Sequence, residues 1–407
     1  MTEPTPRRLL VSGGAVCLTW MATRMAMAWL WHARGQFLMN DVSYYFYSLH
    51  RPNAAALTEY PTPVLWLLRL FQALAAGNFG TFLDLFVGLM VILDALITVF
   101  LFWRASPLAA GYWVVYLALL GPIIWFRIDL IPAACVTLGL LVLTSWPRHS
   151  GVLLAIGAAT KMWPALLILP TLGRGATAKA RLIGFAAAGG VLAAASLVLD
   201  GWGRSVSPIA WQAERGLQIE SLCATWPMIL HATRKGAVIV RMSPYHAYQV
   251  TGTGVAAGET AVAWLTGATI ALVLVLTLLL AVRPALADRR RPGVARPPHT
   301  YAVVVAATAI IAAMIASNKT FSPQYLIWLG GPLGLVLTRA PSPGDRRAGV
   351  VAAGLGLTIA GLTQAVFPLD YAGLVSYPLG NLGVTSLLVA RNALMAVLML
   401  WLVWWAL

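Results

Sequence analysis

The stretch Thr81–Trp103, TFLDLFVGLMVILDALITVFLFW, decides the class of fold. It is longer than the roughly 20 apolar residues that an α-helix needs to cross the hydrocarbon core of a bilayer. Similar apolar runs lie near residues 9–31, 107–125, 130–145, 182–199, 256–282, 300–316, 323–338, 348–367 and 384–406. The sequence therefore predicts an all-α, polytopic transmembrane protein with about ten spans, forming a single domain over residues 1–407.

The composition supports this class and excludes others. The chain is 60% hydrophobic and only 10% charged, whereas soluble domains carry about a quarter charged residues. Its net charge of +15 is typical of a membrane protein with basic cytoplasmic loops, so we do not expect nucleic acid as a partner. Three cysteines are too few for a disulfide framework. No known phosphate, dinucleotide or metal motif is present in a suitable context, and we expect neither metal nor cofactor.

The distribution of arginine predicts how the spans alternate across the plasma membrane. We expect residues 9–31 to be the first span, because this run is too long for a cleaved signal peptide, and we place Arg7 and Arg8 in the cytoplasm. The cytoplasmic loops then contain Arg104, Arg148, Arg174, Lys179, Arg181, the run Arg283–Arg296, Arg339, Arg346 and Arg347. This distribution follows the positive-inside rule. The external loops are expected near residues 32–80, 200–255 and 368–383.

Two features interrupt this simple pattern. Arg24 lies inside the first span, where we expect it to snorkel to the interface or to pair with another helix. Residues 151–170 are apolar but have basic loops at both ends. A re-entrant hairpin of two short helices, broken around Lys161–Pro164, accounts for both flanks because proline cannot continue a helix. Lys161 would then point toward the external side.

Charged residues of both signs collect in the external segments, and we interpret them as one assembled site. The alternative is that they are ordinary solvated loop charges. That alternative suits Arg204, Arg234, Lys235 and Arg241, which stand away from the apolar runs.

The first candidate lies in the segment LMNDVSYYF, which begins at Leu38. We expect Asn40 to cap a short helix and to place Asp41 in its first turn. Tyr44 and Tyr45, at i+3 and i+4, then share the face of Asp41, and the helix N-terminus favours the ionised carboxylate. Such a carboxylate suits a general base for a sugar hydroxyl. Simple capping of an interfacial helix is the alternative.

Further charged candidates border apolar runs. Glu59 stands in EYPTP, just before the run Val64–Leu70, where it can orient a sugar or pair with an arginine. Arg127 and Asp129 stand between two spans. Because residues two apart do not share a helix face, a tight turn would be needed for both side chains to face a cavity. A local salt bridge between them is the alternative.

The motif SNKTFSPQY contains the next group of candidates. Ser322 as N-cap and Pro323 as the first helical residue predict a helix start. Free N–H groups at this start, together with Lys319, would form an anion site suited to phosphate. Contact with lipid headgroups is the alternative. Gln324 and Tyr325 complete this motif as candidate substrate contacts.

The segment ERGLQIES supplies the last two candidates. Arg215 and Glu220 bracket apolar residues, a pattern typical of an amphipathic interfacial helix. We regard both side chains as candidate substrate contacts.

Taken in order, these motifs resemble those of the GT-C membrane glycosyltransferases. They comprise an acid after the first span, EYPTP, RID between spans, KMWP, RGLQIES and SNKTFSPQY, over about residues 30–340. The chain most resembles glycosyltransferase family 87, the actinobacterial polyprenyl-phosphate-mannose-dependent α-mannosyltransferases. The resemblance implies a first-loop acid as catalytic base, which here is Asp41. Many GT-C enzymes carry a pair of acids in that loop, so Glu59 is a rival.

The resemblance also implies the reaction. It is an inverting transfer of a sugar, which the family resemblance implies is mannose, from a polyprenyl-phosphate donor to a glycolipid or polysaccharide acceptor at the outer face. The leaving phosphate needs cations more than a general acid, and Lys319, Arg127 and Lys161 are candidates. An arabinofuranosyl donor is one alternative. A transporter or flippase of lipid-linked or anionic solutes is another, although the charges are one-sided and no internal repeat is visible.

Overall fold

The computed structural model describes residues 6–50, 57–172, 176–244, 247–290 and 299–407. Almost all of this chain is helical, which confirms the coarse prediction of an all-α fold. The exception is one antiparallel pair of short strands, β1 (Val238–Met242) and β2 (Tyr248–Gly252). Arg51 and Arg174, as well as residues 291–296 of the basic run, lie outside the described residues.

The α-helices are, in chain order, α1 (Pro6–Arg34), α2 (Asn40–His50), α3 (Thr62–Ala75), α4 (Phe79–Arg104), α5 (Pro107–Leu120), α6 (Leu130–Leu141), α7 (Pro147–Thr160), α8 (Ala176–Glu214), α9 (Thr225–Thr233), α10 (Val255–Arg290), α11 (His299–Ala316), α12 (Ile327–Thr338), α13 (Pro343–Gln364), α14 (Tyr371–Val375) and α15 (Leu382–Ala406). Short 3₁₀ helices, η1 to η5, cover Gln36–Met39, Pro122–Trp125, Trp163–Thr171, Leu222–Ala224 and Pro323–Leu326, and a π-helical turn, η6, covers Ala365–Leu369.

Five of the described helices are long and apolar enough to cross a membrane, namely α4, α8, α10, α13 and α15. They contain the predicted spans 81–103, 182–199, 256–282 and 384–406, and α13 together with η6 contains the predicted span 348–367. The other predicted spans fold as α1, α5, α6, α11 and α12, which are not among the five. The predicted count of ten spans is therefore not confirmed.

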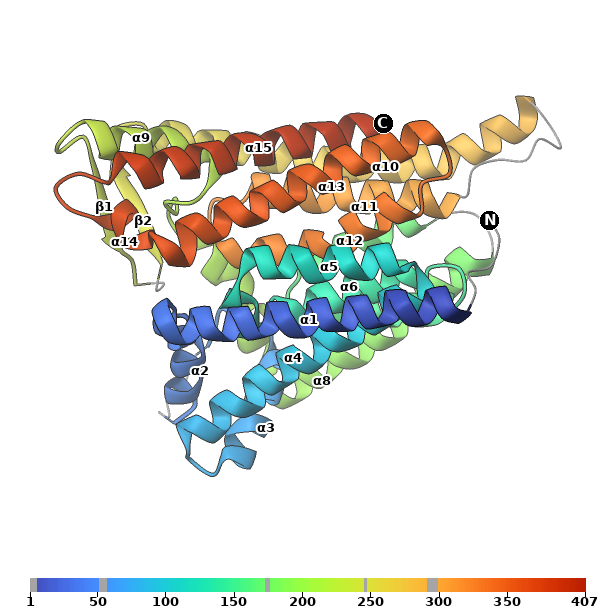
Figure 1. The fold of residues 1–407 in the computed structure, drawn as a ribbon, viewed down its shortest axis with the longest axis horizontal. Helices are drawn as coiled ribbons and strands as arrows, with labels where there is room; N and C mark the ends of the chain where they lie inside the picture. Colours follow the sequence, from blue (N-terminus) through green and yellow to red (C-terminus); the bar gives the residue numbers. More distant parts are fainter. Residues whose placement is uncertain (1–5, 51–56, 173–175, 245–246, 291–298) are drawn as a thin grey trace.

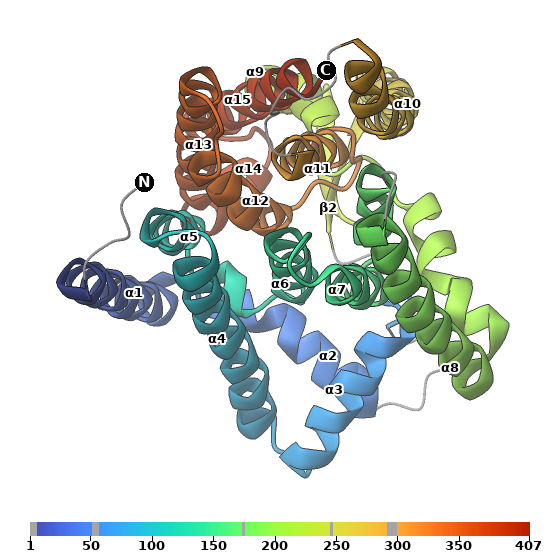
Figure 2. The ribbon, with the colours of Figure 1, turned by 90° about the vertical axis from the view of Figure 1, so that its right-hand side faces the viewer.

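The middle of the molecule is filled by short helices rather than long ones. Most side chains of α6 and α12 are buried, and α6 lies among α4, α7 and α12, as the end-on view of Figure 2 shows. A helix that is apolar on every side must be covered on every side. Gly331 permits this packing, because a Cβ there would overlap the Thr137 side chain on α6.

The predicted break at Lys161 is present. It separates α7 from η3, and the two halves are shorter than any of the five long helices. Arg181 of α8 shows where the chain leaves and returns: its Nη1 donates to the Leu143 carbonyl (2.9 Å) and its Nη2 to the Thr171 carbonyl (2.7 Å). Residues 143 and 171 therefore lie at the same end of the hairpin. Arg181 is buried at this junction rather than exposed in a loop.

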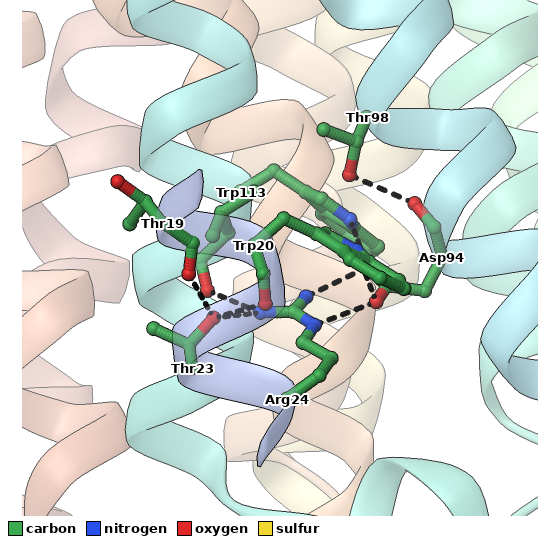
Figure 3. A network of polar contacts seen from close by, with 8 residues as sticks. Thr19, Trp20, Thr23, Arg24, Asp94, Thr98 and Trp113 are labelled. Carbon is green, nitrogen blue, oxygen red and sulfur yellow. Dashed lines mark hydrogen bonds and ion pairs between the residues drawn. The ribbon is translucent and has the colours of Figure 1, made fainter. Parts of the chain in front are cut away.

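A buried ion pair fastens α1 to the bundle (Figure 3). Arg24 binds Asp94 of α4 through two contacts, Nε to Oδ2 and Nη2 to Oδ1, each 2.8 Å long. The indole N–H groups of Trp20 and Trp113 donate to the same carboxylate at 2.9 and 2.8 Å. Arg24 also donates to the Val114 carbonyl of α5 (2.9 Å). Pairing with another helix, one of the two expectations for Arg24, is thus confirmed.

The predicted external segments are folded, and they gather at one end of the molecule. Figure 1 shows α2, α3, α9, α14 and the two strands at the left, whereas α1 begins and α15 ends toward the right. Gly201, with φ of 78°, breaks α8 before this end is reached. The candidate site residues lie in the segments that meet at this end.

Candidate functional site

Asp41 is held by an ion pair with Arg127. Arg127 Nε lies 3.0 Å from Asp41 Oδ2, and the side chains are 10% and 37% exposed. The guanidinium also donates through Nη1 to the carbonyls of Leu38 (3.1 Å) and Phe126 (3.0 Å). Three fixed contacts orient Arg127, and Arg127 in turn orients one oxygen of Asp41. The remaining oxygen, Oδ1, has no protein partner among the described residues and can reach solvent.

Asp129 pairs with Lys161, so the salt bridge between Arg127 and Asp129, one of the expected alternatives, does not form. Lys161 Nζ lies 2.6 Å from Asp129 Oδ1, and Trp328 Nε1 donates to the same oxygen at 2.8 Å. The ammonium also lies 4.4 Å above the Tyr325 ring, which stacks on Trp328 at 4.5 Å. This cation is held by charge and by ring faces together.

The expected N-cap at Asn40 is wrong. η1 ends at Met39 and leads directly into α2, and the Asn40 amide already donates to the Phe37 carbonyl. Asp41 therefore does not lie at a free helix N-terminus, and its charge partner is Arg127 instead. Tyr45 is on the expected face but buried, with its hydroxyl 2.9 Å from that of Tyr60.

The neighbourhood of Asp41 favours neutral phenols. Burial, followed by the charge of Asp41, raises the pKa of Tyr45 well above its usual value, although Arg127 opposes the shift. Burial and nearby negative groups, including Asp41, do the same for Tyr60. Both hydroxyls therefore remain hydrogen-bond donors or acceptors at any working pH and do not compete with Asp41 as bases.

Glu59 lies in a turn that α8 fixes. Arg204 Nη2 donates to the carbonyls of Leu57 (2.8 Å) and Tyr60 (2.9 Å) on either side of it. Arg204 is thus a half-buried clamp and not the solvated charge that we expected, whereas Arg234, Lys235 and Arg241 are exposed as expected. Burial, then the charge of Glu59 and a hydrogen bond to it, raises the pKa of Tyr44. Glu59 and Tyr44 therefore interact directly.

The segment 214–221 is not the expected amphipathic helix. The Val250 amide donates to the Leu217 carbonyl (3.0 Å), and the Ile219 amide donates to the Tyr248 carbonyl (3.2 Å). The chain pairs with β2 here through one isolated antiparallel bridge between Gln218 and Gln249. These backbone hydrogen bonds with a distant segment stabilise an extended chain in place of the helix that the local charge pattern predicted.

The SNKTFSPQY loop is bound to this extended segment. The Gln218 amide donates to the Lys319 carbonyl (2.9 Å), and Ser221 Oγ donates to the Asn318 carbonyl (3.1 Å). Ser322 precedes η5 as predicted, with Pro323 at its start, but its hydroxyl does not cap the helix. It lies 3.1 Å from Gln218 Oε1 instead. Two motifs that are about 100 residues apart in sequence thus form one unit.

Lys319 and Arg215 are close enough to influence each other. Burial lowers the pKa of Lys319, Glu259 opposes this shift, and the positive charge of Arg215 adds to it. Arg215 is half-buried, and its Nε has no hydrogen-bond partner among the described residues. The charges of Glu259 and Arg215 therefore both act on Lys319. Gln324 is half-buried nearby in sequence.

Glu220 is buried against Arg391 of α15. Arg391 Nη2 donates to the Glu220 backbone carbonyl (2.9 Å), and its Nη1 lies 3.5 Å from the Glu220 carboxylate. Burial raises the pKa of Glu220 to about 7, although Arg391 opposes the shift. The side chain is 1% exposed, so Glu220 is a structural neighbour of the site and not an exposed substrate contact in this conformation.

The structure thus forms two groups from the predicted residues. Asp41, Arg127, Asp129, Lys161 and Tyr325 form a continuous group, because Arg127 and Asp129 are two residues apart and serve one pair each. The group around Lys319 and Glu220 is the second. Charges of both groups act on Tyr371: burial and then Glu220 raise its pKa, while Arg391 and Arg127 oppose the rise.

The sequence analysis missed several polar residues. Arg391, Asp94 and Trp328 lie inside apolar runs and were counted only as parts of spans. Arg391 and Asp94 could have been noticed, because ionisable residues within spans are rare and usually paired. No group of three or more possible metal ligands occurs among the described residues.

Comparison with known proteins identifies no relative. No family model, no curated protein and no solved structure matches this chain.

Proposed function

We propose that this chain is an inverting GT-C-type glycosyltransferase that moves mannose from a polyprenyl-phosphate donor to a glycolipid or polysaccharide acceptor. The observation that carries the proposal is the pairing of the partly exposed Asp41 with the buried Arg127, next to the Asp129–Lys161 pair. One carboxylate oxygen remains available for a substrate in a surrounding of fixed cations. The reaction would occur at the outer face of the plasma membrane.

In this proposal Asp41 is the base. Its free Oδ1 accepts the proton of the acceptor hydroxyl while the hydroxyl oxygen attacks the anomeric carbon. The bond from that carbon to the phosphate oxygen breaks, and polyprenyl phosphate leaves with the electron pair. Arg127 directs the carboxylate, because its Nε lies 3.0 Å from Oδ2 and leaves Oδ1 for the substrate. Glu59 is the rival base, but its contact with Tyr44 favours a structural role.

Cations near the leaving phosphate would stabilise its growing charge. Lys319 and Arg215 are proposed for this task, since each charge influences the other and the backbones that carry them are joined by the hydrogen bond between Gln218 and Lys319. Lys161 is proposed to face the sugar side, where Asp129 and the Tyr325 ring fix its position. The aromatic stack offers a flat apolar wall of the kind that sugar rings pack against.

The proposal includes the finer topology. The ten predicted spans would cross the membrane with both termini in the cytoplasm and with the end that holds α2, α14 and the strands outside. The shorter helices α5, α6, α11 and α12 would cross as members of a packed bundle, where neighbouring helices and not lipid cover them.

A direct assay tests the reaction. Purified protein in nanodiscs is incubated with polyprenyl-phosphate mannose, or separately with an arabinofuranose donor of the same lipid, and with a lipid acceptor extract. The proposal predicts a product heavier by one hexose, with release of polyprenyl phosphate, only with the mannose donor. Transfer from the arabinofuranose donor alone would replace the sugar assignment. Passage of intact donor across reconstituted vesicles, without cleavage, would favour the transporter and refute the enzyme.

A further inference from the structure

Arg391 contacts both loops of the Lys319 group. Its Nη2 donates to the Glu220 carbonyl (2.9 Å), and its guanidinium carbon lies 4.4 Å from the centre of the Phe321 ring. The following residue, Asn392, donates to the Ser221 carbonyl (3.3 Å). The first half of α15 therefore binds backbone carbonyls of the 218–221 segment and the face of an aromatic ring in the 318–322 loop.

The N–H groups of Arg391 bind a different kind of acceptor from those of Arg24. Arg24 makes two close contacts with the carboxylate of Asp94, which also receives two indole N–H groups. Neither carboxylate oxygen of Glu220 receives a hydrogen bond from the residues that the structure describes. The close contact of Arg391 is with a backbone carbonyl instead. Its geometry is that of a residue that fixes a loop rather than one that neutralises an acid.

The loops held in this way carry the proposed phosphate-binding cations. The Gln218 amide binds the Lys319 carbonyl, so the backbone from which the Lys319 side chain extends is tied to the segment that begins with Arg215. If the two loops separate, the backbone that carries Lys319 moves away from the segment that begins with Arg215. The planar, permanently charged guanidinium suits this task, because it can donate in its plane and stack on a ring at the same time.

We propose that Arg391 is a positioning residue that locks the 218–221 and 318–322 loops together, so that Lys319 and Arg215 face one phosphate group. The inference rests on the proposed function for the identity of that phosphate, which is the polyprenyl phosphate of the donor. Arg391 itself is fully buried and does not touch the substrate.

Hydrogen exchange of the protein in nanodiscs tests the locking directly, without any substrate. Arg391→Met should accelerate amide exchange at residues 217–222 and 318–322 by about 10²–10³-fold, because the Glu220 carbonyl loses its donor and the Phe321 ring loses its cation. Arg391→Lys keeps the charge but not the planar fork and should give an intermediate effect. If Arg391→Met does not fold, the exchange rates of Arg391→Lys decide the test. Arg24→Met is the matched control, since it also opens a buried ion pair but lies outside both loops.

Binding of polyprenyl phosphate tests the purpose of the lock. The proposal predicts that Arg391→Lys raises the donor KM and the Kd for polyprenyl phosphate about tenfold or more, with a smaller change in kcat, whereas Arg24→Met leaves both constants near those of the unaltered protein. Unchanged exchange in the two loops, or equal acceleration by Arg24→Met, would overturn the locking role. Loosened loops with an unchanged Kd would overturn the phosphate role. No binding of polyprenyl phosphate by the unaltered protein would instead refute the proposed function, and the exchange result would still decide the locking role.

Discussion

Removing one partner of the Arg24–Asp94 pair should destabilise the protein more than removing both. In Arg24→Met, Asp94 loses two contacts of 2.8 Å and keeps only the indole N–H groups of Trp20 and Trp113. Asp94 is fully buried, so its charge is left without compensation. Breaking a buried pair in this way costs about 3–5 kcal/mol.

The double variant Arg24→Met/Asp94→Leu removes both charges and fills the space with apolar atoms. Replacing a buried pair by apolar residues of similar volume is often neutral or stabilising. We therefore expect the double variant to recover most of the loss, leaving a cost of about 0–2 kcal/mol. The two indole N–H groups lose their acceptor, which is the main remaining cost.

Reversible unfolding in mixed micelles with increasing SDS measures these free energies. Asp94→Leu alone completes the double-mutant cycle, and its cost should resemble that of Arg24→Met. Single variants that lose less than about 1 kcal/mol would show that the pair is solvated or dispensable. A double variant whose loss equals the sum of the single losses would refute the coupling that Figure 3 depicts.

Three further predictions follow from the site. Burial raises the pKa of Glu220 to about 7, so between about pH 4.5 and 7 its carboxyl is protonated in the folded state and ionised in the unfolded state. Folding stability should therefore fall as pH rises through this window, by up to about 3 kcal/mol. In Glu220→Gln this slope should disappear in unfolding titrations, and an unchanged slope would contradict the assignment. Lys319→Ala should lower kcat/KM for the donor by about 10–150-fold, the value of one charge-assisted contact, with the fold intact; normal donor kinetics in steady-state assays would exclude its role. In a variant without native cysteines, an impermeant thiol reagent added outside intact cells should label Tyr377→Cys, at a position that is 86% exposed, but not Gly344→Cys in the first turn of α13; the reverse pattern would invert the topology.

The sequence was sufficient for the features that depend on composition and on local patterns. Apolar runs of sufficient length predict membrane helices because the bilayer core offers no partner for the backbone, and the stretch Thr81–Trp103 became α4. Pro164 and the flanking basic loops predicted the break between α7 and η3 for an equally local reason. These signals need no knowledge of the partner segments.

Features that depend on distant partners were not predictable in the same way. The sequence indicated that Arg127 and Asp129 would both be used, but their partners, Asp41 and Lys161, are set by how helices pack. The expected helix at 214–221 failed because pairing with β2 satisfies its backbone groups instead. One sequence contains no signal for such a pairing, since it depends on a segment about 30 residues away.

The most direct test of the central claim compares two conservative variants in the sugar-transfer assay. Asp41→Asn keeps the shape of the side chain but removes its basicity, and Glu59→Gln does the same for the rival acid. If Asp41 is the base, Asp41→Asn should lose about 10²–10⁴-fold in kcat while polyprenyl-phosphate binding and folding persist, and Glu59→Gln should remain active. An active Asp41→Asn together with an inactive Glu59→Gln would contradict the account and assign the base to Glu59.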